Sequence, residues 1–142
     1  MQLTDTHCHL YWHKFDEDRE AMIQRAIEAG VSKMLVPGTT IETSKQAIEL
    51  AEKYSQVYAA VGVHPTDAET NTEKNADQLF ELAKHEKVAA IGEVGLDYYW
   101  VKDSEKQQHQ KRVLNSQVQI ADALNKSLVI HLRESGDAVE GP

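Results

Sequence analysis

Val57–Val63, VYAAVGV, is a nearly continuous apolar run that ends in a glycine and a valine. Such a run is typical of a parallel β-strand covered on both faces, whereas a strand with one face in water alternates apolar and polar residues. The sequence predicts a helix on each side of it, Glu42–Tyr54 before and Lys74–His85 after. A strand between helices of this length indicates βαβ units with right-handed crossovers.

The same alternation continues in both directions along the chain. With 142 residues, 41% of them hydrophobic, the chain is long enough for one domain with a sizeable core. The remaining predicted strands are Gln2–His7, Ser32–Pro37, Val88–Val94 and Ser127–His131, and the remaining predicted helices are Asp16–Ala29, Ser104–Leu124 and one that begins at Glu134. This order predicts an α/β fold with about five parallel strands and helices between them.

The composition excludes several classes of protein. A net charge of −8 argues against nucleic-acid binding through a broad basic surface, although bound divalent cations can still attract a phosphate. The single cysteine cannot form an internal disulfide, which favours a reducing compartment. Because the sequence shows neither an apolar run of transmembrane length nor a secretory signal, we expect a cytoplasmic protein without a membrane partner.

Two histidines mark the end of the first predicted strand, in the segment Thr4–Leu10. His7 and His9 are two apart, so on a strand their imidazoles point to the same side and converge on one point, as a metal ion requires. Glu93 and His131 stand at the ends of two later predicted strands, where ligands gather in parallel α/β folds. Imidazoles with a carboxylate suit zinc, manganese or another divalent ion such as magnesium, and the two oxygens of Glu93 allow it to bridge two ions.

Four motifs together resemble the TatD-type metal-dependent deoxyribonucleases, a family similar in layout to the wider amidohydrolase group. They are DTHCHL at 5–10, GVHP at 62–65, GEVGLDYY at 92–99 and IHLRES at 130–135, and the resemblance covers essentially the whole chain. It implies a TIM-type (β/α)8 barrel, a site for one or two metal ions, and hydrolysis of DNA phosphodiester bonds by metal-activated water. It assigns metal binding to His7, His9, Glu93 and His131, with Glu93 bridging the ions as the catalytic carboxylate.

Two further residues are predicted to bind substrate. His64 ends the Val57–Val63 strand at the same mouth; the alternative is a histidine that is bonded only to its own loop. Arg133, two residues after His131, is in reach of a substrate phosphate; the alternative is a surface ion pair with Glu134 or Asp137.

Other residues near the mouth have less specific predictions. Asp97 opens the loop after the fourth predicted strand and is expected to shape the pocket. Trp12 and Trp100 lie in loops at the mouth, where they either stack on a nucleobase or pack their loops. Cys8 points away from the two flanking histidines, so we expect it in the core.

The resemblance implies a barrel of about 250 residues, of which residues 1–142 form the N-terminal part as a single domain. The family's later metal-binding histidine and aspartate have no counterpart in this sequence. Five strands leave a partial barrel that is either open or completed by oligomerisation, so we expect self-association through the sheet edges.

Three functions remain open. The first is a metal-dependent deoxyribonuclease that hydrolyses ester bonds. The second is a hydrolase of amides, lactones or phosphotriesters on the same scaffold, which Glu93 disfavours because several of those relatives have a carbamylated lysine on this strand. The third is an inactive half-barrel that only binds metal.

Overall fold

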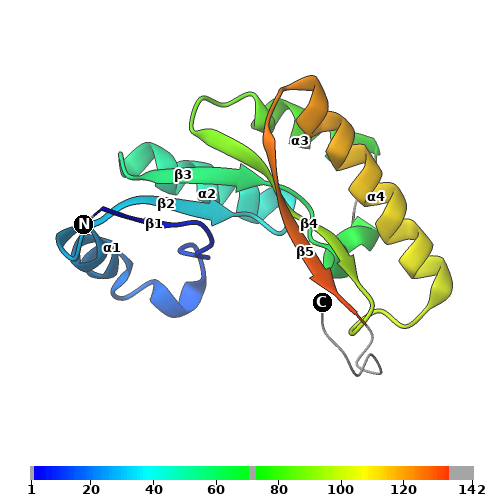
Figure 1. The fold of residues 1–142 in the computed structure, drawn as a ribbon, viewed down its shortest axis with the longest axis horizontal. Helices are drawn as coiled ribbons and strands as arrows, with labels where there is room; N and C mark the ends of the chain where they lie inside the picture. Colours follow the sequence, from blue (N-terminus) through cyan, green and yellow to red (C-terminus); the bar gives the residue numbers. More distant parts are fainter. Residues whose placement is uncertain (1, 71–72, 135–142) are drawn as a thin grey trace.

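The computed structural model describes residues 2–70 and 73–134, in which five parallel strands form one sheet in the order β1-β2-β3-β4-β5 (Figure 1). The strands are β1 (Leu3–Asp5), β2 (Val31–Pro37), β3 (Val57–Val61), β4 (Val88–Asp97) and β5 (Ser127–Arg133). The helices are α1 (Arg19–Glu28), α2 (Ile41–Lys53), α3 (Glu73–Ala83) and α4 (Ser104–Ala123), with short 3-10 helices η1 (His13–Phe15) and η2 (Pro65–Thr70).

The sheet is curled into half of a TIM-type barrel, with helices packed along it (Figure 1). This confirms the predicted fold class, a partial barrel of about five parallel strands. In the described part of the chain β1 and β5 are the two edges of the sheet, and self-association through them stays a prediction. None of the helices within residues 2–70 and 73–134 combines the length and apolarity needed to cross a bilayer.

The apolar run that predicted a doubly covered strand forms β3 at the centre of the sheet. Val57, Ala59, Ala60 and Val61 are fully buried. Helix α2 packs on this strand, and it begins at a capping box in which the Thr40 hydroxyl accepts a hydrogen bond from the Thr43 N–H. The centre of the fold therefore follows directly from local sequence pattern.

Several element boundaries differ from those predicted, and three of them lie close to the candidate site. β1 ends at Asp5 rather than at His7, because its pairing with β2 covers only three residues. α1 begins at Arg19 rather than at Asp16, because the Arg19 side chain donates to the Leu10 carbonyl and holds the preceding loop. β4 continues to Asp97, which pairs with Arg133 at the end of β5. The helix predicted from Glu134 lies outside the described residues.

Candidate metal centre

His7 and His9 lie in the segment that follows β1, and main-chain contacts fix this segment. The Asp5 carboxylate accepts a hydrogen bond from the His7 N–H at 3.0 Å, and the Cys8 N–H donates to the Leu35 carbonyl of β2 at 3.1 Å. The two Nε2 atoms lie 3.2 Å apart. The predicted convergence is therefore present, but the reason given for it was wrong, because it comes from the turn after the strand rather than from strand alternation.

Cys8, between the two histidines, faces the other way. Its thiol donates to the Leu35 carbonyl at 3.4 Å, and its side chain packs against the main hydrophobic cluster. Burial raises the pKa of the Cys8 thiol to about 12, and the nearby Asp5 carboxylate acts in the same direction. A thiol with so high a pKa is a poor nucleophile. The packing of Cys8 against the main hydrophobic cluster confirms the predicted core position.

Glu93 points toward these histidines from an irregular part of β4. The register between β4 and β5 shifts between Ile91 and Val94, which is the kind of irregularity that re-aims side chains in a sheet. The Glu93 N–H donates to the Gly38 carbonyl at 2.8 Å, and the residue is only 8% exposed. The carboxylate is thereby held inside the curl of the sheet.

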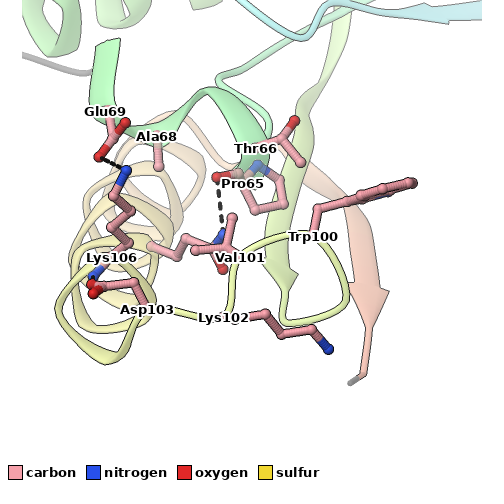
Figure 2. A pocket seen from close by; sticks show the side chains of 10 residues that line it. Pro65, Thr66, Ala68, Glu69, Trp100, Val101, Lys102, Asp103 and Lys106 are labelled. Atoms are coloured by element: carbon pink, nitrogen blue, oxygen red, sulfur yellow. Dashed lines mark hydrogen bonds and ion pairs between the residues drawn. The ribbon is translucent and has the colours of Figure 1, made fainter. Parts of the chain in front are cut away.

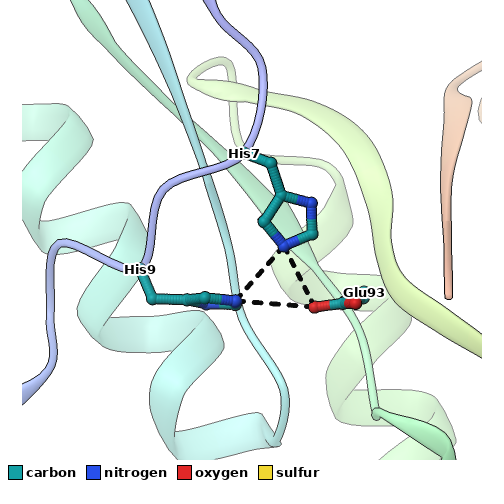
Figure 3. Close-up of side chains that lie close together, drawn as sticks. All are labelled: His7, His9 and Glu93. Carbon is teal, nitrogen blue, oxygen red and sulfur yellow. Dashed lines mark hydrogen bonds and ion pairs between the residues drawn. The ribbon is translucent and has the colours of Figure 1, made fainter.

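One oxygen of Glu93 faces a first group of ligand atoms (Figure 3). Oε2 lies 3.2 Å from His7 Nε2 and 3.5 Å from His9 Nε2. As Figure 3 shows, the three side chains close a triangle around one point. Two imidazoles and a carboxylate in this arrangement are a donor set that suits zinc or manganese.

The other oxygen of Glu93 faces a second group. Oε1 lies 3.0 Å from His131 Nδ1 and 3.8 Å from His64 Nε2, and the two imidazole rings are 4.2 Å apart between centroids. His64, predicted only to bind substrate, is therefore placed among atoms that could hold a second ion. All four residues predicted as ligands meet at one place, with His64 added to them.

The charge state of both groups favours metal binding. Burial raises the pKa of Glu93, but the hydrogen bond with His9 and the neighbouring His7, His64 and His131 outweigh it and lower the pKa to about 2. Burial, together with the nearby His131, lowers the pKa of His64. At neutral pH Glu93 is therefore ionised and His64 is neutral, which are the forms that coordinate a cation.

The family model described as TatD related DNase matches residues 4–140. The chain belongs to the TatD family. Its curled sheet superimposes on the crystal structure of YjjV, a TatD homolog from Escherichia coli K12, with a TM-score of 0.83 at 36% identity, covering 92% of this chain and 51% of that one.

Curated relatives are similar to this chain in sequence. The metal-dependent hydrolase YabD of Bacillus subtilis is 41% identical over 137 residues, which cover 96% of this chain and 53% of YabD. The 3'-5' ssDNA/RNA exonuclease TatD of Salmonella typhimurium is 37% identical over 122 residues, covering 86% of this chain and 46% of that protein. The chain spans about half the length of the curated relatives it matches.

Three histidines of this TatD-family site have their second ring nitrogen engaged by a fixed partner. His9 Nδ1 lies 3.0 Å from the Pro37 carbonyl, and His64 Nδ1 lies 2.7 Å from the Thr66 hydroxyl. His131 Nε2 lies 3.0 Å from the Asp97 carboxylate. In each case the other nitrogen is the one that faces Glu93, which is how outer partners orient metal-binding histidines.

Asp97 contributes more than the predicted shaping of the pocket. It is 1% exposed, and its second oxygen accepts from the Trp100 N–H at 2.8 Å. Burial acts to raise the pKa of Asp97, but the hydrogen bond from Trp100 and the neighbouring His131 outweigh it and lower the pKa. The Asp97 carboxylate is therefore ionised. It holds the His131 ring at Nε2, while Nδ1 of the same ring faces Glu93.

Sequence reasoning missed two buried glutamines on α4. Gln110 accepts from the Asp97 N–H at 3.0 Å and donates to the Pro65 carbonyl at 3.1 Å. Gln117 accepts from the Val63 N–H at 2.8 Å and donates to the Val63 carbonyl at 3.1 Å. Together they hold the main chain on both sides of His64 and at Asp97. Their only signal in the sequence is a seven-residue spacing, which places them on one face of the helix.

Arg133 contacts an aromatic ring within the described residues, and its predicted binding of a substrate phosphate stays a prediction. In the described part of the chain its guanidinium lies over the Tyr99 ring, 4.1 Å from the centroid, rather than against Glu134. Asp137, the other predicted partner, lies outside the described residues. The guanidinium stays exposed at the end of β5.

Proposed function

We propose that this chain is a metal-dependent hydrolase that cleaves phosphodiester bonds in nucleic acid. The observation that carries the proposal is the position of Glu93, whose two oxygens each face a separate group of imidazoles. His7, His9 and Glu93 would hold one divalent ion, and Glu93, His64 and His131 a second. When bound, such ions supply Lewis-acid stabilisation of a phosphate and lower the pKa of water.

The residues present fit a pair of ions by their chemistry. Every donor is an imidazole nitrogen or a carboxylate oxygen, and the lowered pKa of Glu93 keeps its charge available. Glu93 would keep the two positions at a fixed spacing, while Asp97 holds His131 in the tautomer that turns Nδ1 toward Glu93. In this role Glu93 is the catalytic residue and Asp97 a positioning residue.

The choice of phosphodiesters rests on the relatives and on Arg133. TatD of Salmonella typhimurium is named as a 3'-5' ssDNA/RNA exonuclease, and it is 37% identical to this chain over 122 residues. Arg133 stands two residues after His131 on β5, so both side chains face the same side of the sheet. Its guanidinium would bind a phosphate beside the proposed ions.

Hydrolysis assays with the purified chain test this proposal. We expect manganese or zinc to support cleavage of a labelled oligodeoxynucleotide, and EDTA to abolish it. A panel that adds amide and lactone substrates separates the remaining possibilities. Turnover of those substrates alone would identify a different hydrolase, and metal binding without any turnover would identify an inactive half-barrel.

Replacing Asp97 with asparagine is expected to weaken metal binding at the Glu93–His64–His131 group about 10–100-fold. The substitution removes the charge that supports His131 while it keeps the shape of the side chain. Calorimetric titration with Mn²⁺ measures the effect, and Asp122→Asn, an exposed carboxylate on α4, is the matched control. An Asp97→Asn protein with unchanged affinity would contradict the assigned role.

A further inference from the structure

Two exposed aromatic rings and a guanidinium form a ledge beside the candidate metal centre. This aromatic ledge consists of Tyr99, Trp100 and Arg133. Trp100 is 66% exposed and Tyr99 is 38% exposed. The rings meet edge to face with centroids 4.8 Å apart, and the Arg133 guanidinium lies 4.1 Å from the Tyr99 centroid and 5.6 Å from that of Trp100. A large apolar surface and a positive charge are therefore presented together to solvent.

The ledge is fixed to the metal centre through Asp97. One oxygen of Asp97 accepts from the Trp100 N–H, and the other faces His131 Nε2. The Tyr98 N–H donates to the Arg133 carbonyl at 2.8 Å, which ties the loop to the end of β5. Arg133 and His131 face the same side of that strand and are two residues apart. The ledge therefore lies on the order of 7 Å along the strand beyond the second ligand group.

A hollow of about 310 Å³ adjoins the ledge on its other side. Trp100 and Lys102 line it together with Thr66, whose hydroxyl is bonded to His64. Figure 2 shows that the Trp100 ring projects away from Lys106 and Asp103 rather than folding onto α4. Loop packing, the alternative predicted for Trp100, therefore does not account for the exposure of most of its ring.

We propose that Trp100 is a stacking platform for a nucleobase of single-stranded nucleic acid, one nucleotide away from the phosphodiester bound by the ions proposed at Glu93. This inference rests on the proposed function. Exposed aromatic rings next to cationic side chains are how proteins bind unpaired bases, because every base offers a π-face, whereas bases inside a duplex are already stacked on one another. With a net charge of −8, the chain lacks a broad electrostatic attraction for nucleic acid, so local contacts of this kind have to supply affinity.

Equilibrium binding of two matched ligands tests the proposal. The first is a fluorescein-labelled phosphorothioate decathymidylate, which resists cleavage, and the second is the same backbone with abasic sites in place of the bases. With Mn²⁺ present, we expect the wild type to prefer the ligand with bases. Trp100→Ala should weaken binding of that ligand about 5- to 150-fold and bring it to the affinity of the abasic ligand, while Trp100→Phe keeps most of the preference.

Two results would overturn the proposal. In one, the wild type binds both ligands equally; in the other, Trp100→Ala weakens binding of both by the same factor. Because Trp100 is exposed, Trp100→Ala should keep the wild-type unfolding midpoint and metal content, which separates a binding effect from misfolding. Failure of the proposed function is distinguishable, since the wild type then cleaves no phosphodiester, whereas the uncleavable ligands report on Trp100 in either case.

Discussion

Glu93→Gln should abolish nearly all hydrolysis, with a loss of roughly a thousandfold or more in rate. Glutamine has the shape of glutamate but not its charge, and Glu93 is the one side chain shared by both ligand groups. We therefore expect the variant to lose both ions, whereas His7→Ala and His131→Ala should each lose one. Metal counted per chain after dialysis, alongside oligonucleotide cleavage, measures both effects.

Glu86→Gln is the control for this series, because Glu86 is an exposed carboxylate in the turn before β4. It should retain full activity and full metal content. If Glu93→Gln kept two ions per chain and its activity, the proposed role of Glu93 would be wrong. A variant that kept the ions but lost activity would place Glu93 in the chemistry rather than in holding the ions.

Gly95→Ala should lower the free energy of unfolding by roughly 2–6 kcal/mol, the sum of a crowding cost and a backbone cost. Gly95 pairs with His131 across β4 and β5 and has a φ of +152°, which alanine adopts only with strain. An added Cβ would fall on the His131 carbonyl oxygen and 2.7 Å from its carbonyl carbon. Relief of that clash pushes β5 away from β4 and takes His131 away from Glu93.

Urea denaturation measures the loss in the free energy of unfolding. Metal binding shows which of the two ligand groups the substitution distorts. If the variant folds, the Glu93–His64–His131 group should bind its ion more weakly, while the His7–His9–Glu93 group is affected less. Leu132→Ala is the control on the same strand: Leu132 is 70% exposed, so its removal should change stability by no more than about 0.5 kcal/mol. A Gly95→Ala protein as stable as this control would show that β4 and β5 can separate without cost.

Local pattern was sufficient to predict the fold and most of the candidate ligands that the structure brings together. The apolar run at Val57–Val61 predicts a buried strand by composition alone, and its central place in the sheet comes from pairing with β2 and β4. The carboxyl ends of the strands in a parallel sheet share one edge. The sequence alone therefore predicted that four residues lie close together, namely His7, His9, Glu93 and His131. The direction of each side chain was harder to predict, because β1 ends two residues earlier than expected and Glu93 is aimed by a register shift that depends on β5.

Long-range contacts explain what the sequence did not reveal. Gln110 and Gln117 look like ordinary polar residues of a helix, but Gln117 bonds to a main chain 54 residues earlier. His64 belongs to the second candidate ligand group only because His131 lies beside it. His131 comes from a strand two positions further along the sheet. Neither relationship has a periodicity or spacing that a single sequence could expose.

The two α4 glutamines contact only peptide groups at Val63, Pro65 and Asp97, never the side chains of those residues. The support that α4 gives the site is thus independent of the side chains at these three positions. Side chains at the mouth can be exchanged, in evolution or in the laboratory, without rebuilding the frame that carries them. A different set of donors could be grafted onto the same strand ends, and the helix would still hold their backbone in place.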